Sequence, residues 1–226
     1  MNVHRITFGD EGQAATRHLL QQFESLGVRS PNNSSALMAK LRGELKALEA
    51  IDRQYGGSGP LPLEDAGALA AAALTDLARL ESDCRHEGEE MVLGVARLAV
   101  GVALWAVRHE VTLTVAEPVT NALAHLSNAA RSKAELSAVC GVMHGVIENV
   151  RPALQADLER SNPQRPWRLL HVNLAITAVR TEDPALMELA FDALDAALPD
   201  ERAGFYAEAL SVAMGPKVAP SVRQAI

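Results

Sequence analysis

The chain has 226 residues and a formal net charge of −7 at pH 7. Nucleic acid binding favours a basic patch that releases counterions, so this acidic balance argues against a nucleic acid partner. Apolar residues make up 48% of the chain but aromatic residues only 4%. A core must therefore rest on Ala, Leu and Val, and the abundance of Ala and Leu favours an all-α fold.

The sequence also bears on the cellular setting. The N-terminal sequence lacks the apolar stretch of a secretory signal peptide, and no lipidation motif occurs. Cys84 and Cys140 are too few for a disulfide framework. We therefore expect a soluble protein in a reducing cytoplasm.

Two helices are predicted near the N-terminus, over residues 13–26 and 35–55. Gly27 ends the first, since glycine adopts the left-handed conformation without strain. The second carries an apolar stripe that begins at Leu37 and ends at Tyr55, with Leu41, Leu45 and Leu48 between them. A stripe of this kind usually packs on the protein's own core, although the spacing also permits a coiled-coil seam.

The densest cluster of Gly and Pro, YGGSGPLP at 55–62, indicates a boundary or a surface loop. It separates an N-terminal arm and helical hairpin (1–55) from a helical body (62–215), which a short tail (216–226) follows. The body begins with an Ala-rich helix over about 63–82.

The central element of the body is an apolar helix over about 90–110. From Met91 to Val107 the only charged residue is Arg97, and apolar residues or Gly occupy every face. Such a helix must be surrounded by other helices or by lipid. It is shorter than the roughly 20 apolar residues that span a bilayer, and it contains a charge. We therefore predict a buried core helix and no membrane span.

The second half of the chain predicts further short-looped helices. Pro118 suits the first turn of a helix, and Ser132 with Glu135 fits a capping box that begins a helix to about Val150. A short helix from Pro152, one over 167–180, one capped by Asp183 and one over 201–214 follow. About ten helices result, arranged as stacked antiparallel hairpins, either as a solenoid or as an irregular bundle.

One similarity between two segments of the chain supports a repeat. The segments at 102–110 and 174–182 share the pattern Ala-Val-Arg-x-Glu, and each precedes a helix with Pro near its start. The hairpin over 167–199 resembles a tetratricopeptide-type repeat: Leu174-Ala175 stands at its Leu-Gly pair, and Phe191, Leu194 and Pro199 match its second helix in spacing. Ala178, Met187 and the bulk of Leu194 depart from that pattern. The resemblance implies a curved solenoid whose concave face binds a peptide or a partner protein.

Four residues are candidates for a binding groove, because they are polar or aromatic residues among apolar neighbours: Arg97 and Trp105 in the central helix, and His171 and Asn173 in the helix over 167–180. Arg and Trp are common at binding hot spots. The alternative is that the polar groups reach the surface or make structural hydrogen bonds.

Catalytic and metal-binding motifs are scarce. Zinc could be bound by four ligands of two types, Cys84, His86, Cys140 and His144, but these residues lack the compact spacing of a zinc motif. No nucleophile elbow, phosphate-binding loop or paired Glu-x-x-His motif occurs. We therefore predict no cofactor, no metal and no enzymatic activity.

The resulting hypothesis is a non-enzymatic interaction module, an adaptor or chaperone-like scaffold that binds a partner protein or peptide segment in a helical groove. The alternatives are a carrier of an apolar small molecule or lipid, a structural homo-oligomer such as a homodimer through the stripe over 37–55, and an enzyme without a recognisable motif.

Overall fold

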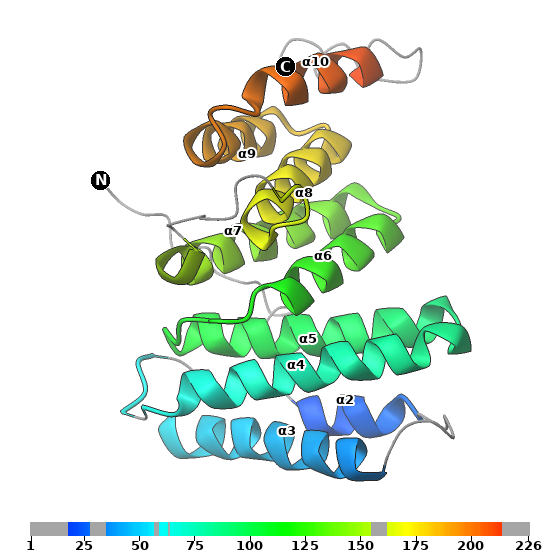
Figure 1. The fold of residues 1–226 in the computed structure, drawn as a ribbon, viewed down its shortest axis with the longest axis vertical. Helices are drawn as coiled ribbons and strands as arrows, with labels where there is room; N and C mark the ends of the chain where they lie inside the picture. Colours follow the sequence, from blue (N-terminus) through cyan, green and yellow to red (C-terminus); the bar gives the residue numbers. More distant parts are fainter. Residues whose placement is uncertain (1–17, 28–34, 57–58, 63, 155–161, 214–226) are drawn as a thin grey trace. The chain divides into compact units, whose positions relative to one another are not determined.

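The computed structural model describes residues 18–27, 35–56, 59–62, 64–154 and 162–213, and all regular structure in these ranges is helical (Figure 1). The prediction of an all-α fold is therefore confirmed. The described part of the chain forms nine α-helices and one 3-10 turn: α2 (Leu19–Ser25), α3 (Ser35–Tyr55), α4 (Ala66–Cys84), η1 (Arg85–Glu87), α5 (Glu89–Arg108), α6 (Glu117–Ala129), α7 (Lys133–Leu154), α8 (Pro166–Thr181), α9 (Pro184–Ala197) and α10 (Arg202–Ala213).

The chain divides into two compact units. Met1–Asn128 and Gly145–Ala156 form the first, and Ala129–His144 and Asp157–Ile226 form the second. Helix α7 contributes residues to both. This division does not follow the Gly- and Pro-rich segment at 55–62, because α3, which precedes that segment, packs against α4, which follows it.

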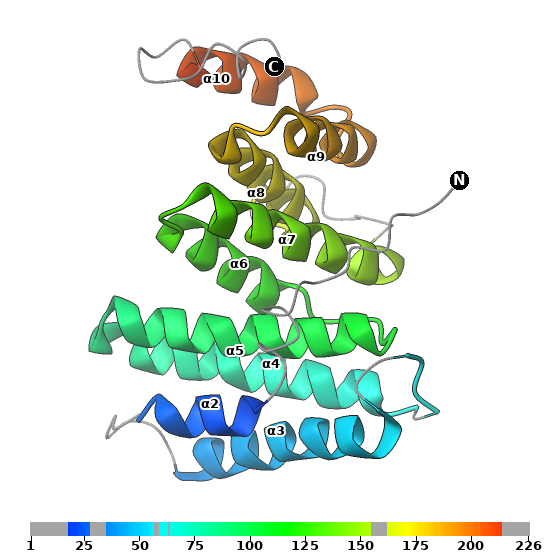
Figure 2. The same ribbon diagram turned by 180° about the vertical axis from the view of Figure 1, so that it is seen from behind.

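The first unit is built around α5. Helix α5 contacts α4 and α2, while α3 contacts α2 and α4 (Figure 2). By length and composition α5 is the one helix among the described residues that could cross a membrane, but 72% of its apolar window is buried inside the protein. It has the surroundings of a core helix.

The stripe on α3 faces the interior of this first unit. Leu41, Leu45 and Leu48 have no exposed surface, whereas Leu37 and Tyr55 at the ends of the stripe are half-buried. The stripe is therefore covered by the chain's own helices. A homodimer seam along it would require α3 to leave these neighbours.

A buried histidine at the end of α5 contacts Gly59 and the C-terminal part of α3. His109 follows the C-terminus of α5 and its side chain is fully buried. Its Nδ1 lies 3.1 Å from the carbonyl oxygen of Gly59, and its Nε2 lies 2.6 Å from Asp52 Oδ1. Both ring nitrogens face oxygen acceptors, so each N–H that the ring carries can donate a hydrogen bond to the oxygen it faces. Arg108 adds a hydrogen bond to Asp52 Oδ2 at 3.0 Å.

Two carboxyl groups are buried at the α3–α4 contact. Asp76 is 1% exposed and Glu44 is 8% exposed. Lys40 Nζ lies 2.6 Å from Asp76 Oδ2 and 3.6 Å from Glu44 Oε1. Burial, together with the charge of Asp76, raises the pKa of Glu44. Lys40 therefore lies between the two carboxyl groups, and Arg79 adds a second cation at 3.4 Å from Asp76 Oδ1.

The predicted helix caps agree with the structure, with one correction. Glu135 N donates to Ser132 Oγ at 3.2 Å, and Ser132 N donates to Glu135 Oε2 at 3.2 Å, which is the reciprocal pattern of a capping box. The side chain of Asp183 accepts a hydrogen bond from Ala185 N and caps α9. The prediction that a new helix begins at Pro152 is wrong, because α7 continues to Leu154. A proline near the end of a long helix removes one hydrogen bond there without ending it.

The two Ala-Val-Arg-x-Glu segments end their helices in the same way. Glu110 follows α5 and Glu182 follows α8, and both adopt left-handed backbone with φ of 56°. Helices commonly end with such a residue, usually a glycine. Helices α6 and α9, which follow, each have a proline in the first turn. The similarity of the two segments in sequence therefore corresponds to a similar local structure.

Candidate functional site

Arg97 and Trp105 occupy different environments on α5. Arg97 is exposed, and Trp105 has no exposed surface. The Trp105 ring lies 4.9 Å from the His109 ring between centroids, and its Nε1 has no hydrogen-bond partner among the described residues. Trp105 is therefore a core residue in this conformation. Arg97 reaches the surface, which is the alternative that the sequence left open.

His171 and Asn173 lie on α8. His171 is 1% exposed, its Nδ1–H donates to the carbonyl oxygen of Trp167 at 2.8 Å, and its ring packs edge-on against Trp167. Asn173 is half-buried, and its backbone carbonyl accepts a hydrogen bond from Thr177 Oγ1. His171 thus has a structural hydrogen bond. None of the four sequence-derived candidates lines either of the two pockets described below.

The four candidate zinc ligands are not arranged as a metal site. Cys84 is buried and His86 is exposed on η1, while Cys140 and His144 lie one turn apart on α7. Among the described residues, no group of three or more His, Cys, Asp or Glu side chains is placed to hold a metal ion. Burial raises the pKa of the Cys140 thiol to about 11, which opposes the thiolate form that zinc or nucleophilic chemistry requires.

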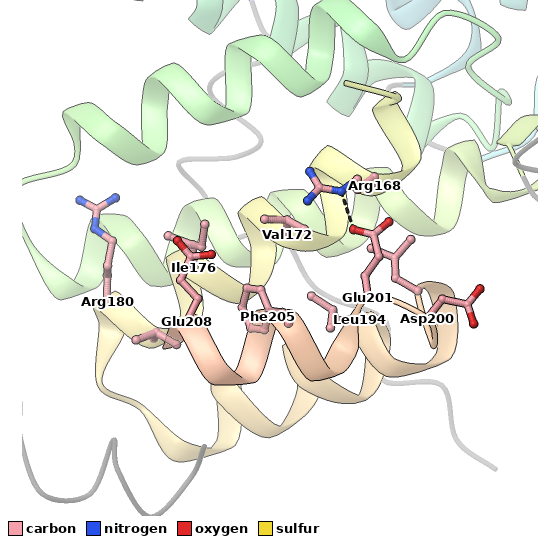
Figure 3. A pocket seen from close by; sticks show the side chains of 12 residues that line it. Arg168, Val172, Ile176, Arg180, Leu194, Asp200, Glu201, Phe205 and Glu208 are labelled. Carbon is pink, nitrogen blue, oxygen red and sulfur yellow. Dashed lines mark hydrogen bonds and ion pairs between the residues drawn. The ribbon is translucent and has the colours of Figure 1, made fainter. Parts of the chain in front are cut away.

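A groove with a mainly apolar lining lies in the second unit, formed by α8, the end of α9 and α10. We name it the α8–α10 groove, and its volume is about 730 Å³. Ile176, a large apolar side chain on the wall of the groove, is 47% exposed. The apolar residues that line the groove are Val172, Ile176, Val179, Leu194, Leu198 and Phe205 (Figure 3).

Helical periodicity explains how α8 supplies one wall. Arg168, Val172, Ile176 and Val179 follow one another at intervals of three or four residues, so they share one face of the helix. The span from Arg168 to Arg180 covers about 18 Å at 1.5 Å per residue. Val172 and Val179 are half-buried on this face. The wall therefore has the length of about three helical turns.

The opposite wall is α10, and an aromatic cluster positions it. The ring of Phe191 on α9 lies 5.3 Å from that of Tyr206 and 6.2 Å from that of Phe205, both in edge-on geometry. Burial and the neighbouring Asp195 raise the pKa of Tyr206 to about 12, so its hydroxyl stays protonated. These contacts fix α10 to α9 while leaving Gly204 on the groove side.

Gly204 accounts for part of the open space. A Cβ placed on Gly204 meets nothing within 4 Å. A larger residue at this position of α10 would project into a space that the present sequence leaves unfilled. Gly204 lines the groove, so a large side chain at this position has room to occupy part of it.

The two ends of the groove carry charged groups. Glu201 accepts hydrogen bonds from Arg165 Nη2 at 2.6 Å and from Arg168 Nε at 2.5 Å. Burial alone would raise the pKa of Glu201, but the two arginines outweigh it and hold the pKa below its usual value. Figure 3 shows Arg168 and Glu201 joined at one end of the groove and Arg180 at the other. The apolar residues lie between these ends.

A second, polar cleft of about 540 Å³ lies in the first unit, between the η1 region and α6. Glu81, which is 8% exposed, accepts a hydrogen bond from Arg85 at 3.2 Å, and His125 Nε2 lies 3.5 Å from the same carboxylate. Asn121 and Asn128 complete the α6 side. Its charged groups already face one another, so this cleft offers less than the α8–α10 groove to an apolar ligand.

Comparisons with family models, with characterised proteins and with solved structures find no match to this chain. The choice of site therefore rests on the geometry alone.

None of the residues that line the α8–α10 groove is among the candidates that the sequence suggests. One signal was available: Val172, Ile176 and Val179 are apolar at helical spacing on a different face of α8 from the buried Leu170 and Leu174. A helix with apolar residues on two faces needs a second neighbour or exposes one face. That pattern indicates an extra surface without revealing which helix lies opposite.

Proposed function

We propose that the chain is a non-enzymatic interaction module that binds an apolar-faced helical segment of a partner protein in the α8–α10 groove. The observation that carries this proposal is the apolar groove of about 730 Å³ with the exposed Ile176 on its wall. Helix-in-groove recognition uses apolar anchors of the partner at i, i+3 or i+4 and i+7. The length of the α8 wall suits about three turns of such a helix.

The weak resemblance to a tetratricopeptide-type hairpin lies in the same part of the chain. It covers α8 and α9 and implies peptide binding on a helical surface. The proposed setting is the cytoplasm, which suits two buried cysteines that form no disulfide.

The test is a groove-filling variant assayed with a defined peptide. The probe is a fluorescein-labelled amphipathic helix of about four turns, with Leu on one face and Gln on the other. We expect saturable binding to the wild-type protein by fluorescence anisotropy. Gly204→Leu fills the open space and should abolish the binding. It also replaces a helical glycine, so it should raise stability by up to about 1 kcal/mol.

Gly43→Leu is the matched control. Gly43 lies within α3 in the first unit, is exposed, and likewise has nothing within 4 Å of an added Cβ. It should stabilise the protein and leave peptide binding unchanged. A wild-type protein that fails to bind, or binding that survives Gly204→Leu, contradicts the proposal.

A second candidate is a carrier of a small apolar molecule. The groove volume lies within the range of roughly 300–1,000 Å³ that is typical of ligand pockets. Native mass spectrometry before and after denaturation distinguishes this function, because a carrier retains an organic mass that unfolding releases. A bare chain mass would leave the protein-binding proposal as the better one.

A further inference from the structure

The α10 side of the groove carries two acidic groups that no residue in the described part of the chain neutralises. Asp200 precedes α10 and Glu208 lies within it, and both are exposed and line the groove. Neither carboxylate makes a hydrogen bond or an ion pair with any residue in the described ranges. Glu201 lies beside them, but Arg165 and Arg168 already occupy its two oxygens.

The basic groups of the groove are less available. Arg168 is held by Glu201 and by the carbonyl oxygen of Pro163. Arg180 also makes an interaction within the chain. The unused charges on the groove are therefore negative, in a chain whose net charge is −7.

We infer that the α8–α10 groove selects a basic amphipathic helix, in which Lys or Arg residues flank the apolar face that enters the groove. This inference rests on the proposed function and names the class of partner.

The spacing of the acidic groups supports a helical occupant. Glu208 lies six residues, or about 9 Å, along α10 from Arg202, and Asp200 lies two residues before that helix. Basic residues at i and i+7 of a partner helix are separated by about 10.5 Å, a spacing of the same order. Such a partner can place one cation at each carboxylate while its apolar residues contact Ile176 and Phe205 between them.

An acidic helix fits poorly, because its charges would approach Asp200 and Glu208. A membrane surface fits poorly for the same reason, since its anionic headgroups attract basic segments and repel acidic ones. Charge complementarity of this kind gives specificity and faster association more than raw affinity. The expected effect is therefore a preference among peptides with the same apolar face.

The test uses three labelled peptides with one Leu face and a polar face of Lys, Gln or Glu. For the wild-type protein at low salt we expect the Lys peptide to bind about three- to thirtyfold more tightly than the Gln peptide. The Glu peptide should bind most weakly. The preference should shrink as ionic strength rises, because exposed charges are screened.

Asp200→Asn combined with Glu208→Gln should remove most of this preference, so that the affinities of the Lys and Gln peptides differ by less than about twofold. The matched control is Glu188→Gln combined with Asp192→Asn, which removes the same two residue types from exposed positions on α9 that do not line the groove. The control should retain the preference, although the net charge changes equally. Vesicles of anionic lipid should not bind detectably.

The outcomes separate the two proposals. Equal binding of the Lys and Gln peptides, both lost in Gly204→Leu, overturns the basic-partner inference and leaves the proposed function standing. A preference that persists without Asp200 and Glu208, or that the α9 control also loses, overturns the inference as well. Vesicle binding that the Asp200→Asn, Glu208→Gln protein loses would also overturn it. If no peptide binds in a manner sensitive to Gly204→Leu, both proposals fail.

Discussion

Small residues occur both in the packed helices α4 and α5 and on the wall of the α8–α10 groove. They are buried in the first case and border open space in the second. In α4, Ala70 and Ala73 are fully buried, and α5 contributes Val102 and Ala103 with no exposed surface. Large and small side chains complement each other there and leave both helices covered. On α10, Gly204 faces open space, and Ile176 on α8 stays 47% exposed. Small residues permit close packing only where a neighbouring helix fills the space they leave.

The largest expected effect comes from truncating one large apolar residue in each region. Leu77→Ala on α4 removes a side chain with no exposed surface and should cost about 2–5 kcal/mol. Ile176→Ala removes a side chain that is already half in water and should cost less than about 1 kcal/mol. Urea denaturation followed by circular dichroism measures both. Equal losses would mean that the groove wall is as tightly packed as the core.

Polar groups also differ in burial between the first unit and the α8–α10 groove. Inside the first unit, His109 is sealed between Asp52 and the Gly59 carbonyl, whereas the acidic groups of the groove remain in solvent. His109→Phe keeps a ring beside Trp105 but removes two hydrogen bonds from a buried position. We expect a loss of about 1.5–3 kcal/mol in unfolding free energy.

Arg97→Ala serves as the control for His109→Phe, because it removes a charged side chain from the exposed face of the same helix. Its effect should stay within about 0.5 kcal/mol. A larger loss for Arg97→Ala than for His109→Phe would reverse the assignment of Arg97 as a surface residue. Thermal denaturation of the two variants in one buffer provides the comparison.

Glu44 predicts a pH-dependent effect in the first unit. Because its pKa is raised in the folded protein, folding favours the protonated form, and this contribution to stability is lost as the pH rises through the folded-state value. Glu44→Gln is neutral at every pH and should therefore be more stable than the wild type at pH 7. The gain should shrink as the pH falls and vanish well below the ordinary carboxyl pKa of 4.5, where the wild-type carboxyl group is protonated in both states. A gain that is constant with pH would contradict this reasoning.

Local signals in the sequence predict the helices well. Ser132 with Glu135, Pro118 and Asp183 each act through neighbours a few residues away, so their roles can be recognised without a tertiary structure. The apolar residues around Leu98 likewise predict a buried helix, because a helix that is apolar on every face is not stable in water. These features determine the fold class and most of the helix boundaries.

The groove depends on information that the sequence does not display. Gly204 is a helical glycine, and a glycine carries only a small penalty in helix propensity. Its importance appears only in the structure, where Val172 and Ile176 line the same groove. The same limit explains Trp105 and Arg97. Their positions on α5 were clear, but which face α4 and α2 cover depends on tertiary packing.

The smallest expected effect concerns the two Ala-Val-Arg-x-Glu segments, one at the end of α5 and the other at the end of α8. Glu110 after α5 and Glu182 after α8 both adopt left-handed backbone, which glycine tolerates better than glutamate. Glu110→Gly should therefore stabilise the protein by about 0.5 kcal/mol.

Glu182 also accepts a hydrogen bond from Lys133 Nζ at 2.7 Å, and the loss of this partly exposed pair offsets the gain. Glu182→Gly should then be close to neutral, and Lys133→Ala combined with Glu182→Gly should recover the gain relative to Lys133→Ala alone. Differential scanning calorimetry at pH 7 resolves these steps, and a destabilised Glu110→Gly would show that the side chain of Glu110 contributes more than its backbone conformation costs.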